Sequence, residues 1–106
     1  METFKSYYID IDDTICTLSI PGDYSSAEPI LKAINKVNEL YSKGNRVTFW
    51  TARGTVTGMD WKHLTETQLE AWGVKYHELK FGKPAYDVFI DDKNINSIDW
   101  HNSIQE

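Results

Sequence analysis

The chain has 106 residues, of which 41% are hydrophobic and 13% aromatic, so it is long enough for one domain with a substantial core and too short for two. Its formal net charge of -5 and its lack of any Lys/Arg-rich run argue against binding to nucleic acid. The N-terminus does not read as a signal peptide, no apolar run has membrane-spanning length, and Cys16 is the sole cysteine. We therefore expect a single cytoplasmic domain over residues 1–106, with no membrane partner.

A first strand is expected over residues 6–11, because this stretch is rich in aromatic and β-branched side chains. It runs directly into three carboxylates, Asp10, Asp12 and Asp13. Like charges at such short range repel one another, and a hard metal ion such as Mg²⁺ is the simplest compensation. The stretch therefore predicts a site at the carboxyl end of the strand.

The next region is expected to be a flap followed by a β-α-β unit. Residues 14–27 contain a strong turn at Pro21-Gly22-Asp23, which predicts a short projecting hairpin or flap. Apolar residues at helical spacing predict a helix over 28–43, and a second strand is expected over 46–50. Strands joined in this way should be parallel, with a right-handed crossover.

The second half continues the alternation of strands and helices. We expect a loop over 51–60, a helix over 61–72 and a strand over 74–79. A connector at 81–84 leads to a fourth strand, 86–90, which ends at Asp91-Asp92, and a short helix is expected within 94–104. The fold class is therefore α/β, a Rossmann-like three-layer sandwich with a small parallel sheet, in which ligands bind beyond the carboxyl ends of the strands.

Four elements are expected to converge at that edge, and their chemistry suits phosphoryl transfer. In an extended segment Asp10 and Asp12 share a face, so one carboxylate can attack phosphorus while the other handles protons. Thr51 would hydrogen-bond a phosphoryl oxygen, and Lys83 would neutralise charge and restrain the nucleophile. The expected oxygen ligands of Mg²⁺ are completed by Asp91 and Asp92.

These residues resemble the motifs of the haloacid dehalogenase (HAD) superfamily of phosphatases. The D-x-D-x-T motif is matched by Asp10, Asp12 and Thr14, the strand-end threonine by Thr51, and the lysine by Lys83. The resemblance, which spans residues 6–92, implies that Asp10 is the nucleophile and Asp12 the acid/base. It also implies that Mg²⁺ is held by the Asp10 carboxylate, the Asp12 carbonyl, and Asp91 or Asp92. Within the superfamily, three segments resemble phosphatases of capsule and lipopolysaccharide sugar biosynthesis: 50–54, 81–84 and 89–94.

The sequence departs from the superfamily pattern in two respects. The 14–27 flap is too short for a cap domain, so the resemblance is to capless members, and specificity must come from the flap, the 52–60 loop or a neighbouring subunit. No fifth strand is evident, which favours a homo-oligomer that completes the core. The expected substrate is a small phosphorylated metabolite, most simply a sugar phosphate.

Other interpretations remain open at this point. A 5′-nucleotidase of the same superfamily also ends its last motif in paired aspartates. A receiver domain, or a catalytically dead binding module, is an alternative of another class, although a receiver would need its phosphoacceptor where only Asp23 lies. The acidic cluster alone would also suit a turn. Arg53 is either a substrate contact or a surface residue, and Cys16 is expected to be a small packing residue.

Overall fold

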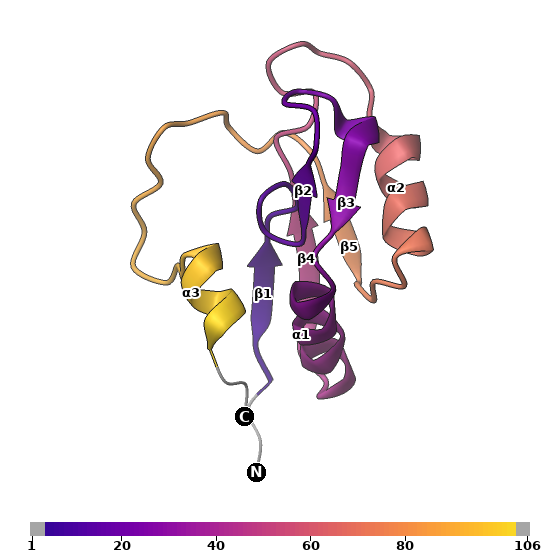
Figure 1. Cartoon of the computed structure of the whole chain (residues 1–106). Helices are drawn as coiled ribbons and strands as arrows, with labels where there is room; N and C mark the ends of the chain where they lie inside the picture. Colours follow the sequence, from indigo (N-terminus) through magenta and orange to yellow (C-terminus); the bar gives the residue numbers. More distant parts are fainter. Residues whose placement is uncertain (1–3, 104–106) are drawn as a thin grey trace.

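The computed structural model describes residues 4–103 (Figure 1). Three parallel strands form the main sheet in the order β1-β4-β5, and an antiparallel pair, β2-β3, projects beside it. The strands are β1 (Ser6–Ile9), β2 (Cys16–Leu18), β3 (Ala27–Pro29), β4 (Arg46–Trp50) and β5 (Glu78–Lys80). The helices are α1 (Leu31–Ser42), α2 (Lys62–Ala71) and α3 (Ser97–Asn102), and a 3-10 turn spans Tyr24–Ser26.

The parallel β-α-β arrangement is confirmed. Strand β1 pairs with β4, with Ile9 opposite Phe49, and β4 pairs with β5, with Phe49 opposite Leu79. Helix α1 contributes Ile34 and Val37 to the core on the face of the sheet that carries these residues. This apolar contact fixes the register, because a shift of one residue would turn the buried side chains to the opposite face.

The predicted flap is a hairpin that the structure builds from β2 and β3. Cys16 pairs with Pro29 and Leu18 with Ala27, and the Asp23 carboxylate stabilises the turn by accepting a hydrogen bond from the Ser25 N–H. Helix α1 starts at Leu31, later than the predicted residue 28, because the chain up to Pro29 is still paired in this hairpin.

The predicted fourth strand over 86–90 is wrong for the described chain. Strand β5 ends at Lys80, and residues 84–96 then form an exposed excursion that crosses the carboxyl end of the sheet and descends on the far side of β1 (Figure 1). The physical reason is that the chain is held at the carboxyl end of the sheet just before this segment. The Lys83 N–H donates to the Thr51 carbonyl at the end of β4, and only two residues separate Lys83 from residue 86. The chain cannot return to the start of the sheet to begin another parallel strand.

The predicted three-layer sandwich is seen only in part. Helices α1 and α2 supply Val37 and Leu69 to one core cluster. Helix α3 lies beside α1, since Lys32 donates to the Asn102 side chain. The opposite face of the sheet carries Tyr8, which is 58% exposed, and half-buried Trp50. In the part of the chain that the structure describes, α1 and α2 therefore cover one face of the sheet, and α3 lies beside β1, where its Trp100 reaches the groove (Figure 1). None of the described helices is long and apolar enough to cross a membrane.

Candidate functional site

A tight turn after β1 arranges the acidic cluster. The Ile11 carbonyl accepts hydrogen bonds from the N–H groups of Thr14 and Ile15, at 3.2 and 2.9 Å. Asp13 takes a positive φ of 62°, and its N–H donates to the Cys16 carbonyl. A left-handed conformation is one that Asp tolerates better than most residues. Asp13 therefore shapes the turn that separates the carboxylates of Asp10 and Asp12.

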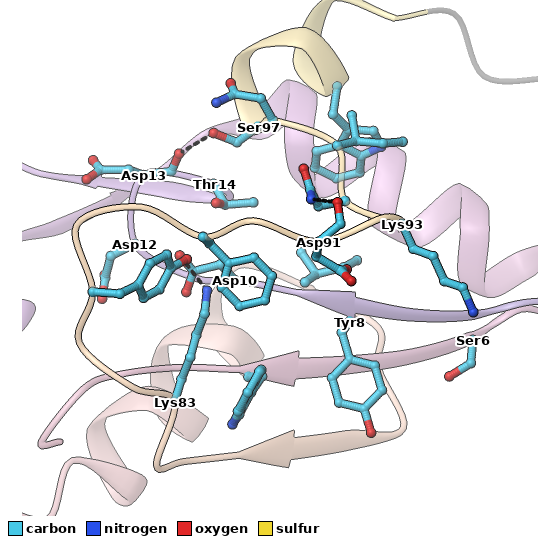
Figure 2. Close-up of a pocket in the computed structure, with 18 residues that line it drawn as sticks. Ser6, Tyr8, Asp10, Asp12, Asp13, Thr14, Lys83, Asp91, Lys93 and Ser97 are labelled. Atoms are coloured by element: carbon cyan, nitrogen blue, oxygen red, sulfur yellow. Dashed lines mark hydrogen bonds and ion pairs between the residues drawn. The ribbon is translucent and has the colours of Figure 1, made fainter.

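Asp10 lies at the carboxyl end of β1 and lines a groove of about 790 Å³ (Figure 2). Its side chain is 36% exposed, and one carboxylate oxygen lies 3.6 Å from the Lys83 Nζ. Partial burial raises the pKa of Asp10, and the neighbouring Asp12 charge raises it further; the Lys83 ammonium and a hydrogen bond from the Ile11 N–H oppose this. The result is a carboxylate that faces an open space with a cation beside it.

Lys83 is held firmly in this position. Its side chain is 11% exposed, and its Nζ lies 5.2 Å from the centre of the Tyr86 ring and 5.9 Å from that of Phe89. Its backbone is bonded at both polar groups, by its N–H to the Thr51 carbonyl and by its carbonyl to the Thr55 hydroxyl. The structure thus brings Lys83 next to Asp10, and the catalytic roles of the two residues stay predictions. The aromatic contacts were not predicted, because Tyr86 and Phe89 fit a strand pattern.

The Asp12 carboxylate differs from that of Asp10, because Arg53 binds it in a bidentate ion pair. Arg53 donates from Nε to one carboxylate oxygen at 3.0 Å and from Nη2 to the other at 2.8 Å. The Arg53 side chain is fully buried and that of Asp12 is 20% exposed. Both Asp12 oxygens are therefore bound to a guanidinium, although the residue still lines the groove.

Arg53 is a buried hub, so the alternative that placed it on the surface is wrong. Its Nη1 donates to the Thr65 hydroxyl at 3.1 Å and to the Gln68 side-chain oxygen at 2.6 Å, and its guanidinium lies 5.0 Å from the centre of the Tyr24 ring. It joins α2 to the turn after β1 and does not line the groove. One pattern in the sequence could have indicated this network: Thr65 and Gln68 lie three residues apart on the predicted helix, on its inward side.

Thr51 lies at the end of β4, fully buried, and its hydroxyl accepts a hydrogen bond from the Arg53 N–H at 3.1 Å. It is not among the residues that line the groove. Its backbone is hydrogen-bonded to both sides of the connector after β5. The Thr51 N–H donates to the Lys80 carbonyl, and the Thr51 carbonyl accepts from the Lys83 N–H. In this conformation Thr51 connects the loops that carry the Arg53 and Lys83 cations.

Asp91 and Asp92 reach the site only in part. Asp91 lines the groove with Asp10, whereas Asp92 does not, and both belong to the exposed excursion (Figure 2). Among residues 4–103 there is no group of three or more His, Cys, Asp or Glu placed to hold a metal ion. Three of the expected Mg²⁺ ligands, Asp10, Asp12 and Asp91, line the same groove without forming such a group, and Mg²⁺ binding stays a prediction.

Cys16 is a packing residue, as predicted. It is fully buried, and desolvation, reinforced by the neighbouring Asp12 charge, raises the pKa of its thiol to about 12. Its thiol donates to the Ile11 carbonyl and the Asp12 carboxylate at 3.6 and 3.5 Å. A thiol that stays protonated at neutral pH is a poor nucleophile.

Comparison with known proteins supports the fold of this chain and does not bear on its chemistry. No protein-family model and no curated protein matches the chain. A crystal structure of a structural-genomics target from Vibrio cholerae is similar to it, with a TM-score of 0.86 and 22% sequence identity, over 95% of this chain and 90% of that one. At this identity the likeness concerns the fold alone, an α/β fold with a small parallel sheet.

Proposed function

We propose that the chain is a capless phosphatase of the HAD type that hydrolyses a small phosphomonoester by way of an aspartyl-phosphate on Asp10. The observation that carries the proposal is the Asp10 carboxylate, open to a groove at the carboxyl end of β1 with the Lys83 ammonium 3.6 Å away. Carboxyl ends of parallel strands are where ligands bind in such sheets. The motif order over Asp10, Asp12, Thr51 and Lys83 supports the same reaction.

The chemistry needs a nucleophile and a neutralising cation, and both face the groove. In the proposed reaction an Asp10 oxygen attacks phosphorus and the phosphorus–oxygen ester bond breaks, releasing the alcohol. Water then attacks the aspartyl-phosphate and releases inorganic phosphate, which regenerates the carboxylate. Lys83 offsets the negative charge on the phosphoryl oxygens throughout, an electrostatic contribution of the kind that dominates phosphoryl transfer.

Asp12 is proposed as the group that protonates the leaving oxygen and later deprotonates water. In the described conformation both of its oxygens accept hydrogen bonds from Arg53. The role therefore requires Asp12 to turn from Arg53 toward the groove that it already lines. Thr51 is proposed to bind a phosphoryl oxygen through a similar small adjustment of the 51–53 loop.

The groove favours a small polar substrate with a flat or ring-shaped body. Its volume of about 790 Å³ lies within the range of small-molecule sites. Its wall combines aromatic side chains with the Lys83 cation. A sugar phosphate in the cytoplasm, as used in the biosynthesis of surface polysaccharides, fits this proposal. Mg²⁺ remains the expected cofactor from the resemblance to HAD phosphatases, and no step above depends on it.

A screen of phosphorylated metabolites with detection of released phosphate tests the proposal. Purified protein with Mg²⁺ should hydrolyse an aryl phosphate or a sugar phosphate, and Asp10→Asn should lower kcat at least about 10³-fold, as expected for loss of a nucleophile. Undiminished activity in Asp10→Asn would refute the assignment. Turnover of nucleoside monophosphates in preference to sugar phosphates would favour the 5′-nucleotidase alternative.

A further inference from the structure

The excursion over 84–96 carries a strand-like sequence that is exposed to solvent throughout. In its apolar part, Val88 is 73% exposed, Phe89 47% and Ile90 92%. A run of three large apolar residues at such exposure is unusual for a folded domain, and β-branched and aromatic residues of this kind favour pairing in a sheet. The segment has the composition of a buried strand and lacks its surroundings.

The main sheet has an open edge that lacks a strand. Strand β1 pairs with β4 on one side, and in the described part of the chain no strand lies on its other side. Parallel sheets in α/β proteins are usually covered on both faces, yet Tyr8 on β1 is 58% exposed. Both an unpaired strand-like segment and an unpaired edge therefore occur in the same chain.

The segment cannot complete the sheet of its own chain and still bring Asp91 to Asp10. Lys83 is tethered to Thr51 at the carboxyl end of β4, and the three steps from Lys83 to Tyr86 span at most about 11 Å. For Asp91 to end a parallel strand level with Asp10, Tyr86 must lie five residues below that level, about 16 Å away. The tether is too short.

The direction of the excursion is compatible with parallel pairing to β1 of a second copy of the chain. It descends beside β1, against the direction of that strand (Figure 1), and Figure 2 shows Lys93 extending toward Ser6 at the start of β1. A two-fold axis perpendicular to the strands reverses their direction. A segment that runs antiparallel to its own β1 therefore runs parallel to the β1 of a two-fold related copy.

We propose that two copies of this chain exchange residues 85–103, so that segment 86–90 of each copy pairs in parallel with the open edge of β1 of the other. The hinge lies directly after the tethered Lys83, where the exposed excursion begins. The exchange adds a fourth strand to each sheet and buries Val88 and Ile90. Backbone pairing with an open edge is a common mode of association.

The contacts of α3 support an exchange that includes this helix. Ser97, at its start, donates to the Asp13 carbonyl in the turn that follows Asp10. After the exchange, Asp92 ends the strand that is added to the partner copy's sheet. The four residues 93–96 are long enough to reach from there to the Asp13 carbonyl of that partner copy, where Ser97 can form the same hydrogen bond. Helix α3 then keeps its contacts, but with the partner copy instead of its own chain.

The exchange also completes the site, a consequence that depends on the function proposed above. In the parallel pairing, Asp91 and Asp92 of one copy lie at the level of Asp10 of the other. The carboxylates that one chain fails to gather would then meet in each of two shared sites. Each site would combine the nucleophile of one copy with the paired aspartates of the second.

The oligomeric state and a cross-link test the exchange without reference to activity. Light scattering after gel filtration should give a dimer. In the proposed register Asp87 lies opposite Ser6, so Ser6→Cys/Asp87→Cys treated with a short bismaleimide should yield a covalent dimer on a denaturing gel. Cys16 does not interfere, because its thiol is buried. A monomer in light scattering would overturn the proposal. So would a result in which the Ser6→Cys/Asp87→Cys variant does not cross-link while a second variant, Ser6→Cys/Lys93→Cys, cross-links within one chain.

Mixed dimers then test the shared site. Asp10→Asn and Asp91→Asn/Asp92→Asn should each be inactive alone. Unfolded together and refolded as a mixture, they should recover about a quarter of the wild-type activity, because half of the dimers are mixed and each mixed dimer has one intact site. A covalent dimer with no recovered activity would refute the shared site but keep the exchange. An inactive wild type would count against the proposed function alone.

Discussion

Asp10 and Asp12 are two residues apart on one strand end, yet they lie in opposite surroundings. The Asp12 carboxylate is saturated by a buried guanidinium that α2 also holds. The Asp10 carboxylate has one cation at 3.6 Å and an open groove in front of it. In this conformation the Asp12–Arg53 pair joins the turn after β1 to α2, whereas Asp10 and Lys83 face the groove together. The two pairs should therefore respond differently to mutation.

The Asp12–Arg53 pair should give the largest change in stability. Replacing Arg53 by Ala leaves the Asp12 carboxylate, Thr65 and Gln68 without their partner, and loss of one member of a buried pair costs about 3–5 kcal/mol. We expect a domain of this size to be largely unfolded, measured by urea denaturation. Arg46→Ala is the matched control, because Arg46 forms an exposed ion pair with Glu78 that is worth at most about 1 kcal/mol. Equal effects of the two changes would contradict the buried hub.

The Lys83 cation should matter for catalysis more than for folding. Lys83→Met keeps much of the side-chain volume but removes the charge next to Asp10, and we expect kcat to fall by about 10²–10³, as for loss of one transition-state donor. Lys80→Met, which alters a cation on the neighbouring strand outside the groove, should leave kcat within about twofold. A similar loss of kcat in both variants would contradict a specific role for the Lys83 charge in catalysis.

Replacing Asp10 should have the smallest effect on stability, and its sign should be opposite to that of Arg53→Ala. Because burial raises the pKa of Asp10 in the folded state, the folded protein binds its proton more tightly than the unfolded chain does. The resulting cost to stability is absent below the ordinary pKa of 3.8, grows as the pH rises through the raised pKa, and is complete above it. Asp10→Asn should therefore raise the melting temperature at neutral pH by less than about 5 °C.

The pH dependence gives this last prediction its control. The gain from Asp10→Asn should shrink toward zero as the pH falls below the ordinary aspartate range, because the wild-type carboxyl is then neutral in both states. Thermal melts of both proteins at neutral and acid pH measure the difference. Asp12→Asn should instead destabilise at neutral pH, since it leaves Arg53 buried without a counterion. A stabilising Asp12→Asn would remove the distinction between the two carboxylates.

Local patterns in the sequence were sufficient to predict the β-α-β core. The apolar periodicity of α1 and the compact strand 46–50 depend on neighbours close in sequence, and the structure confirms both. The turn at Pro21-Gly22-Asp23 likewise predicted the hairpin. The placement of Asp10 at a strand end also follows from local pattern alone, because strand direction and side-chain alternation follow from the backbone.

Only the tertiary structure decided the partners that lie far apart in sequence. The burial of Arg53 between Asp12 and α2 depends on residues up to 41 positions away, which no local pattern encodes. The fate of segment 86–90 shows the same limit more sharply. Its composition is that of a strand, but pairing needs a free edge within reach, and the tether at Lys83 denies it the edge of its own β1. Strand propensity is local, whereas strand pairing is a property of chain length and topology.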